Sequence, residues 1–145
     1  MEEFTIIVPT TFDEQHYHAV VRLLTQLTTR DITFTPDMYR ALIEDSCSDL
    51  CLLTDSQAQV VGMLTLNSCV SPTGKRGWIE DVVVDEAYRG KALGRKLVDY
   101  AIGLARERKL QTLMLTSNPK RVAANALYRS MGFEPKETNI YKMQL

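Results

Sequence analysis

Long apolar runs are absent from this sequence of 145 residues. None approaches the roughly 20 residues that a membrane-spanning helix requires. An excess of one charge is absent too, because 17 basic side chains stand against 18 acidic ones and the formal net charge is -1. This balance excludes the simplest kind of nucleic-acid-binding protein, which carries a clear basic excess or stripe. We therefore expect neither a membrane nor a nucleic acid as a partner.

Cysteine is scarce, and its arrangement does not indicate disulfides. The three residues Cys47, Cys51 and Cys69 are an odd set with no sign of a secretory context. The N-terminal stretch Met1-Glu2-Glu3-Phe4 is acidic and lacks the basic-then-apolar order of a signal peptide. These absences favour a cytoplasmic protein.

A metal site is not expected. On a helix, His16 and His18 would point about 200° apart, which makes joint ligation unfavourable. Cys47 and Cys51 span the end of an expected helix and the start of an expected strand, with no further cluster of ligands beside them. Structural or solvent-facing roles suit these four residues better.

Low-complexity segments, repeats and linkers are also missing, and the 7 glycines and 5 prolines are scattered. A chain of this length is typical of one domain, so we expect a single domain over residues 1–145. Folding such a chain buries about two-thirds of its unfolded surface, which suffices for a core without cross-links.

Hydrophobic spacing predicts the elements of the first half. Short β-branched or apolar runs predict strands, and apolar residues at helical spacing predict two helices. The second of these helices also carries an N-capping Thr35 followed by Pro36 at its first position. The expected strands are 4–8, 50–54 and 60–66, and the expected helices are 13–27 and 35–45.

The second half alternates strands with helices. After Arg89-Gly90, apolar residues recur at helical spacing from Leu93 to Leu104 and predict an amphipathic helix, and Gly132 is expected to follow the end of the last helix. The expected strands are 78–84, 112–116 and 139–145, and the last helix is 121–131. This order predicts an α/β (α+β) fold with a mixed, mostly antiparallel central sheet of about six or seven strands and helices on both faces.

The join between the strand at 78–84 and the next helix is the first candidate site. A loop that opens a helix directs several backbone N–H groups at one point and can bind an anion. Arg89, Lys91 and Arg95 add positive charge there. The alternatives are a phosphate or pyrophosphate cradle and an ordinary loop with solvated cations. Gly90 and Gly94 are one residue too close for an ATP-binding P-loop, and a dinucleotide fingerprint would need three glycines.

Two motifs stand in order in this half of the chain. The first, Arg89-Gly90-Lys91-Ala92-Leu93-Gly94, reads Q/R-x-x-G-x-G/A except that Ala92 stands where glycine is usual. The second is Arg121-x-x-Ala124-x-x-Leu127-Tyr128-x-x-x-Gly132-Phe133. Together they resemble the pyrophosphate loop and the helix after the fifth strand in the GNAT superfamily of N-acetyltransferases. The resemblance implies the GNAT acyl-CoA N-acyltransferase fold, with acetyl-CoA as co-substrate and no metal.

The resemblance also implies which residues contact the cofactor. The strand that holds Val82, Val83 and Val84 would splay from its neighbour and pair with the pantetheine arm. Asn118 and Asn125 would add polar contacts. The loop that would hold the pyrophosphate consists of Arg89, Gly90, Lys91, Ala92, Leu93, Gly94 and Arg95.

The implied reaction is direct attack of a neutral amine on the acetyl thioester. The thiol that leaves has a pKa of about 8.5, and a tyrosine with a pKa of about 10 can hydrogen-bond to or protonate its thiolate. The resemblance assigns this role to Tyr128, and also places it in contact with the cofactor. Helical periodicity alone would make Tyr128 a core aromatic.

The base is harder to assign. Glu80 and Asp81 lie in an apolar strand on opposite faces, and burial there would raise a carboxyl pKa and make it a competent base. Either carboxylate could instead anchor the substrate amine or pair with a cation. Some relatives carry a glutamate on the fifth strand, where this chain has Thr116. Glu80 is the favoured base or anchor, with Asp81 beside it.

The acceptor is expected to be a small-molecule amine. Ile79 to Val84, followed by Arg89-Gly90-Lys91, is similar to glucosamine 6-phosphate N-acetyltransferases, so an amino-sugar phosphate is the leading case. A peptide or protein N-acetyltransferase and a non-catalytic acyl-CoA-binding sensor are the alternatives. Relatives are often dimers that pair or exchange the C-terminal strand, which implies a possible homodimer through residues 139–145.

Overall fold

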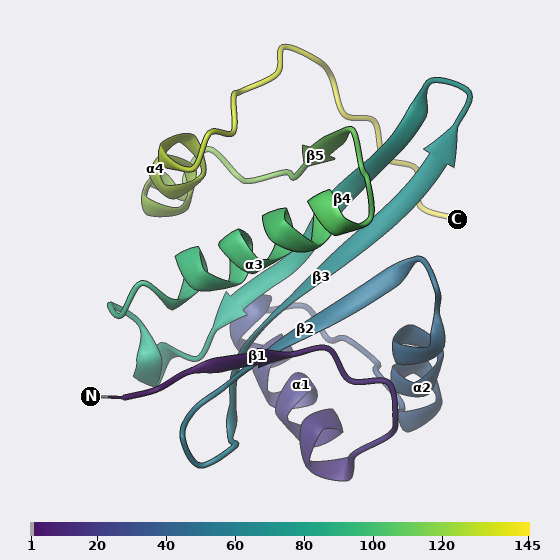
Figure 1. Ribbon diagram of the computed structural model, residues 1–145. Helices are drawn as coiled ribbons and strands as arrows, with labels where there is room; N and C mark the ends of the chain where they lie inside the picture. The colour runs from purple at the N-terminus through teal and green to yellow at the C-terminus, as the bar shows by residue number, and fades with distance from the viewer. Residues whose placement is uncertain (1) are drawn as a thin grey trace.

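A single sheet of five strands in the order β1-β2-β3-β4-β5 forms the centre of the protein (Figure 1). The structure, a computed structural model, describes residues 2–145. The strands are β1 (Thr5–Ile7), β2 (Ser48–Thr54), β3 (Val60–Ser71), β4 (Gly74–Val84) and β5 (Thr112–Met114). The helices are α1 (Glu14–Leu27), α2 (Pro36–Glu44), α3 (Leu93–Glu107) and α4 (Val122–Ser130). Neighbouring strands are antiparallel except for β4 and β5, which are parallel.

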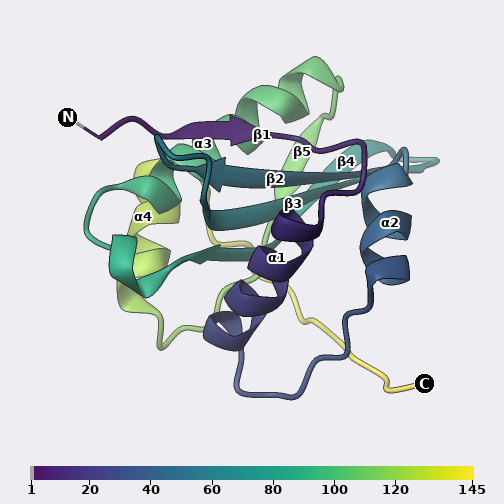
Figure 2. The same ribbon diagram turned by 90° about the horizontal axis from the view of Figure 1, so that it is seen from below.

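Helices cover both faces of this sheet. In Figure 1, α3 and α4 lie on one side and α1 and α2 on the other, and Figure 2 shows α1 and α2 in front of the strands. One core cluster joins α3 and Tyr128 of α4 to side chains such as Leu64 and Ile79. A second joins α1 and α2 to Leu52, Met63 and other residues on the opposite face. The predicted fold class is therefore confirmed.

Both of the first two helices begin with a side-chain cap, and the cap of the second is the predicted one. The Asp13 carboxylate accepts hydrogen bonds from the backbone N–H groups of Gln15 (2.9 Å) and His16 (3.1 Å) at the start of α1. The Thr35 hydroxyl caps α2 in the same way, and Pro36 stands at its first position.

The sheet has five strands among residues 2–145, fewer than the predicted six or seven. The predicted closing strand at 139–145 is wrong: this segment has no regular structure and all of its side chains are exposed. Its alternating apolar residues indicate a strand only if another strand is available to pair with it. In contrast, β3 and β4 run further than predicted, up to a tight hairpin around Pro72 and Thr73. Their outer parts are mostly polar residues and glycine, so hydrophobic patterning did not reveal them.

Candidate active site

The strands β4 and β5 separate shortly after they meet. Only three residue pairs join them, and the last is Trp78 with Met114. Beyond Trp78, β4 continues to Val84 with no strand beside it on that edge among the described residues (Figure 1). The free backbone N–H and C=O groups of such an edge can bind an extended ligand.

A β-bulge lies in this free part of β4. The register shifts between the pairs Thr65–Glu80 and Met63–Val83, which leaves one extra residue on β4. Asp81 in the bulge has φ 54, in the left-handed region that non-glycine residues seldom adopt. As a result, Ile79 before the bulge and Val82 after it pack into the same core cluster under α3.

The loop after β4 ends in a helix start that is open to an anion. Gly90 has φ 84, and Ala92, the N-cap of α3, has φ 59 and ψ 28. No side chain caps α3, so the N–H groups of its first turn stay free for a ligand. The left-handed conformation costs an alanine about 1–2 kcal/mol relative to a right-handed one. At Gly94, an added Cβ would meet nothing nearer than Leu127 Cδ2 at 3.9 Å.

The cationic side chains of this loop bind other groups of the protein at the edge of the loop. Lys91 Nζ lies 2.7 Å from Glu2 Oε2. Arg95 donates to Ser130 Oγ at 3.1 Å and so links α3 to α4. Arg89 Nε donates to a backbone carbonyl of β4 at 3.3 Å. The cradle itself is therefore made by the backbone, with positive charge around it.

Helix α1 holds the start of the same loop, which sequence reasoning missed. The Arg22 guanidinium donates to Val60 O (2.7 Å) and lies 3.6 Å from the carboxylate of Asp85. One helical turn later, Gln26 Oε1 accepts the Glu86 N–H at 2.9 Å. These contacts join residues that are 38 or more positions apart, so no local pattern could have indicated them.

Tyr128 is fixed by the way α4 ends. Gly132 has φ 99 and follows the helix as predicted, and the Phe133 N–H donates to Tyr128 O at 3.0 Å, which completes a Schellman motif. The motif places the Phe133 ring edge-on to the Tyr128 ring, with centroids 6.0 Å apart. The Tyr128 side chain is 8% exposed, and its hydroxyl has no hydrogen-bond partner among residues 2–145. Burial raises the pKa of Tyr128, while Arg121 lowers it.

Glu80 faces the side of the sheet opposite to Tyr128. Ile79 packs under α3 with Tyr128, and strand alternation turns its neighbour Glu80 to the α1 and α2 side, opposite Thr65 of β3. Partial burial raises the pKa of Glu80, and the adjacent Asp81 carboxylate raises it further. The sequence predicts Glu80 and Asp81 on opposite faces of a regular strand. The strand is not regular here, because Asp81 lies in a bulge.

Asn118 and Asn125 lie together where the chain after β5 enters α4. The Asn125 side-chain amide donates to Asn118 O (2.9 Å) and Arg121 O (2.8 Å), and Asn118 Oδ1 accepts the Lys120 N–H (2.9 Å). These bonds brace the loop. They leave the Asn118 side-chain amide and the Asn125 side-chain oxygen without partners among the described residues. Thr116, nearby on the same connection, is exposed.

Comparison with known proteins decides the family. The model of the acetyltransferase (GNAT) family matches residues 17–133, from α1 to the end of the Tyr128 motif. The chain belongs to this family. The resemblance carried by the loop at 89–94 and the helix at 121–133 is thereby confirmed.

Several acetyltransferases are similar to this chain in sequence or in fold. N-alpha-acetyltransferase 30 of Dictyostelium discoideum is 27% identical over 85 residues, and the chain spans about half the length of this curated relative (46%) while 59% of the chain is matched. The glucosamine-6-phosphate N-acetyltransferase of Arabidopsis thaliana has a TM-score of 0.81 at 21% identity, over 97% of this chain and 98% of that one. An aminoglycoside acetyltransferase from an uncultured soil metagenomic sample has a TM-score of 0.81 at 15% identity, over 99% and 97%.

Two features are absent from the described residues. No group of three or more histidine, cysteine, aspartate or glutamate side chains lies within reach of a common metal ion in residues 2–145. No helix in this part of the chain has both the length and the apolar character needed to cross a membrane.

Proposed function

We propose that this GNAT protein transfers the acetyl group of acetyl-CoA to the primary amine of a small molecule. One observation carries the proposal: the free edge of β4 leads directly into a loop that presents an uncapped helix N-terminus. An extended chain with a pyrophosphate at one end matches this arrangement, because amide groups can pair with the edge while the anion lies at the helix.

The residues at this junction fit acetyl-CoA. The backbone of Val82, Val83 and Val84 would pair with the pantetheine arm. The spare polar atoms of Asn118 and Asn125 would contact it. The residues that would surround the pyrophosphate are Arg89, Gly90, Lys91, Ala92, Leu93, Gly94 and Arg95. Acetyl-CoA supplies the activated acetyl thioester.

Glu80 and Tyr128 have complementary proton-transfer roles in this proposal. Glu80 takes a proton from the acceptor amine, whose nitrogen forms a bond to the acetyl carbon while the carbon–sulfur bond breaks. Tyr128 donates its hydroxyl proton, or a hydrogen bond, to the departing sulfur. The two side chains belong to opposite faces of the sheet, so the amine and the thiol can occupy opposite sides of the gap beside β4. Asp81 tunes Glu80 through its charge.

An amino-sugar phosphate is the leading acceptor. The support is the local similarity of residues 79–91 to glucosamine 6-phosphate N-acetyltransferases. A peptide N-terminus is the second candidate, favoured by the sequence similarity to N-alpha-acetyltransferase 30. Fold similarity does not choose between acceptors, since an aminoglycoside acetyltransferase is equally similar in fold.

The test is the release of free thiol from acetyl-CoA across a panel of amines. The panel contains glucosamine 6-phosphate, other amino sugars, amino acids and short peptides, with a control that lacks any amine. We expect strong release with a small amine, led by the amino-sugar phosphate. Release with peptides alone would favour the second candidate. Silence throughout, with no thermal shift from acetyl-CoA, would contradict the proposal.

A cytoplasmic homodimer is the form we propose for the protein. The support for the dimer is the exposed apolar surface of the C-terminal segment, where Ile140, Tyr141, Met143 and Leu145 are 68%, 89%, 82% and 107% exposed. Side chains of this size are usually covered in a soluble assembly, and a second copy of the chain would cover them.

A further inference from the structure

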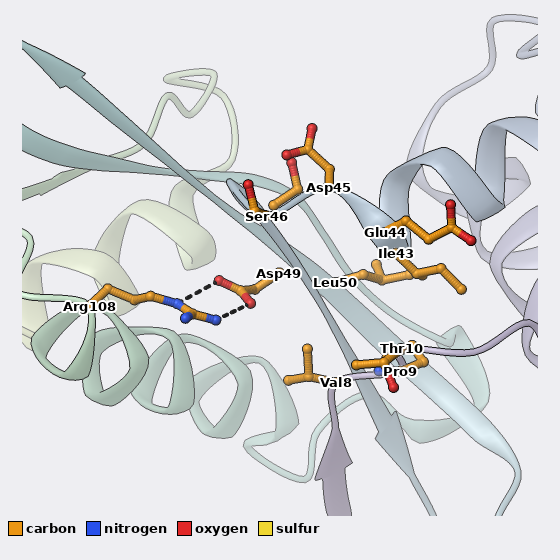
Figure 3. Close-up of a pocket in the computed structure, with 11 residues that line it drawn as sticks. Val8, Pro9, Thr10, Ile43, Glu44, Asp45, Ser46, Asp49, Leu50 and Arg108 are labelled. Carbon is orange, nitrogen blue, oxygen red and sulfur yellow. Dashed lines mark hydrogen bonds and ion pairs between the residues drawn. The ribbon is translucent and has the colours of Figure 1, made fainter.

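A cavity of about 290 Å³ lies beside β2, two strands away from the edge of β4 that forms the candidate active site (Figure 3). It exists because β1 pairs only with residues 52–54 of β2. Pro9 follows β1 and has no N–H with which to continue the ladder. The chain therefore leaves β2, and a space remains between it, the end of α2 and the start of β2. Val8, Ile43 and Leu50 give this space apolar walls.

The single cation in the lining is already engaged. Asp49 is 6% exposed, and Arg108 donates from Nη2 to Asp49 Oδ1 (2.6 Å) and from Nε to Asp49 Oδ2 (3.2 Å). Figure 3 shows this fork at one end of the cavity. The bidentate pair cancels the charge of both partners within the cavity.

The remaining charge of the lining is negative. Glu44 and Asp45 line the cavity, and neither carboxylate has an ion-pair partner among the described residues. Helix α2 ends here without a basic residue in its last turn, so its C-terminal carbonyl groups add negative potential. Hydroxyl groups of Ser46 and Thr10 supply further hydrogen-bond acceptors.

We propose that this cavity binds a small primary ammonium ion that carries a short apolar chain. An ammonium group has three donors and no acceptor, which matches a lining rich in acceptor oxygens, although one oxygen of Asp45 already accepts the Cys47 N–H. The apolar chain would lie against Val8, Ile43 and Leu50. A carboxylate in the same place would be repelled by Glu44 and Asp45. The site is separate from the candidate active site, so the inference does not depend on the proposed reaction.

Isothermal calorimetry with three matched probes tests the proposal. n-Pentylammonium, pentan-1-ol and pentanoate share one apolar chain and differ only in the head group. At pH 7 and low ionic strength, we expect n-pentylammonium to bind about tenfold more tightly than pentan-1-ol and pentanoate to be weakest. Equal affinities for the ammonium ion and the alcohol, or tighter binding of pentanoate, would overturn the proposal.

Variants then locate the binding. Glu44→Gln combined with Asp45→Asn should weaken n-pentylammonium binding about tenfold, and the new amide side chain keeps an oxygen for the Cys47 N–H that Asp45 now accepts at 2.7 Å. The pair Glu134→Gln and Glu137→Gln makes the same change in net charge at exposed positions and should leave binding unchanged. Glu80→Gln should also bind normally. Loss of binding in Glu80→Gln, or normal binding in the Glu44 and Asp45 variant, would show that the ammonium ion binds elsewhere.

Discussion

A side chain at position 94 should affect the folding of the protein and the binding of the cofactor differently. The position lies in the first turn of α3, does not have a positive φ, and has room for a Cβ beside Leu127. The motif Q/R-x-x-G-x-G/A accepts alanine at this position, so the informative change is a larger side chain, Gly94→Leu, which a helical position can hold. The new side chain would stand where a pyrophosphate approaches the helix N-terminus, so acetyl-CoA should bind at least fivefold more weakly by calorimetry.

The matched control for this variant is Gly103→Leu in the same helix. Gly103 is exposed and an added Cβ meets nothing within 4 Å. Replacing a mid-helix glycine by leucine improves helix propensity by about 0.5–1 kcal/mol, and acetyl-CoA affinity should not change. Unaltered affinity in Gly94→Leu would mean that the loop does not hold the pyrophosphate.

The hydroxyl of Tyr128 contributes little to holding the fold, since it has no partner among residues 2–145 while its ring packs against Phe133. Tyr128→Phe keeps the ring and removes only the proton donor. We expect kcat to fall by roughly 10²-fold, in the usual range for proton transfer, with acetyl-CoA affinity unchanged. Tyr100→Phe, on the outer face of α3, is the control and should be neutral. Equal losses of kcat and cofactor affinity would rule out the acid role.

The charge of Asp81 should be visible in the pH profile. Glu80 accepts a proton only when ionised, so activity is lost as the pH falls through its pKa, which burial and then Asp81 raise. Asp81→Asn removes the second cause and should move the acid limb of kcat/KM to lower pH. Both proteins are measured with the same acceptor amine, so the amine's own titration affects both profiles equally. Asp99→Asn is the control for the change in net charge. An unmoved acid limb would exclude Glu80 as the titrating group.

The raised pKa of Glu80 also predicts how Glu80→Gln changes the stability of the protein. A carboxyl group whose pKa is raised by folding stabilises the folded protein below that pKa and reduces its stability above it. At a pH above the raised pKa, Glu80→Gln should therefore unfold at the same or a higher temperature than the original protein. Loss of activity in this variant together with a clear loss of stability would disagree with this assignment.

At the scale of elements, α1 acts as a support for the cofactor loop. Gln26→Met has a similar shape but removes the acceptor of the Glu86 N–H, a bond of about 0.5–1.5 kcal/mol. We expect KM for acetyl-CoA to rise several-fold while kcat stays within about twofold. Gln15→Met, at an exposed position on the same helix, is the control. A fall in kcat with constant KM would show that α1 acts on the chemistry instead.

The sequence predicts those elements whose signals are local. The helices at 13–27, 35–45 and 121–131 are confirmed within a residue or two, because capping residues such as Asp13, Thr35 and Gly132 act within their own turns. The bulge at Asp81 could not be predicted from local signals of this kind. Ile79 to Val84 reads as a continuous apolar strand, and only its pairing with β3 reveals the additional residue.

In the candidate site, too, only the residues with a local sequence signal could be predicted. Residues 89–95 and Tyr128 lie in contiguous motifs and could be assigned from the sequence. The contacts of Arg22 and Gln26 with the loop depend on how α1 packs on the sheet. The spacing of residues within α1 does not predict this packing. The failed strand at 139–145 has the same cause: its apolar residues are present, but the described structure gives them no strand to pair with.

At the scale of the whole molecule, the C-terminal segment should control self-association. All side chains of residues 139–145 are exposed, so removing them should cost little stability. Light scattering should show a dimer for the full chain and a monomer for residues 1–138, with similar melting temperatures. A monomeric full chain, or a dimer that survives the deletion, would contradict the proposed dimer.

Hydrogen exchange with and without acetyl-CoA tests the central claim most directly. The proposed ligand site is the free edge of β4 together with the helix start after it. Acetyl-CoA should therefore slow exchange of the amides at 79–84 and 89–95, and leave the amides that line the cavity beside β2 unchanged. Binding of acetyl-CoA with protection only outside 79–84 and 89–95 would contradict the account.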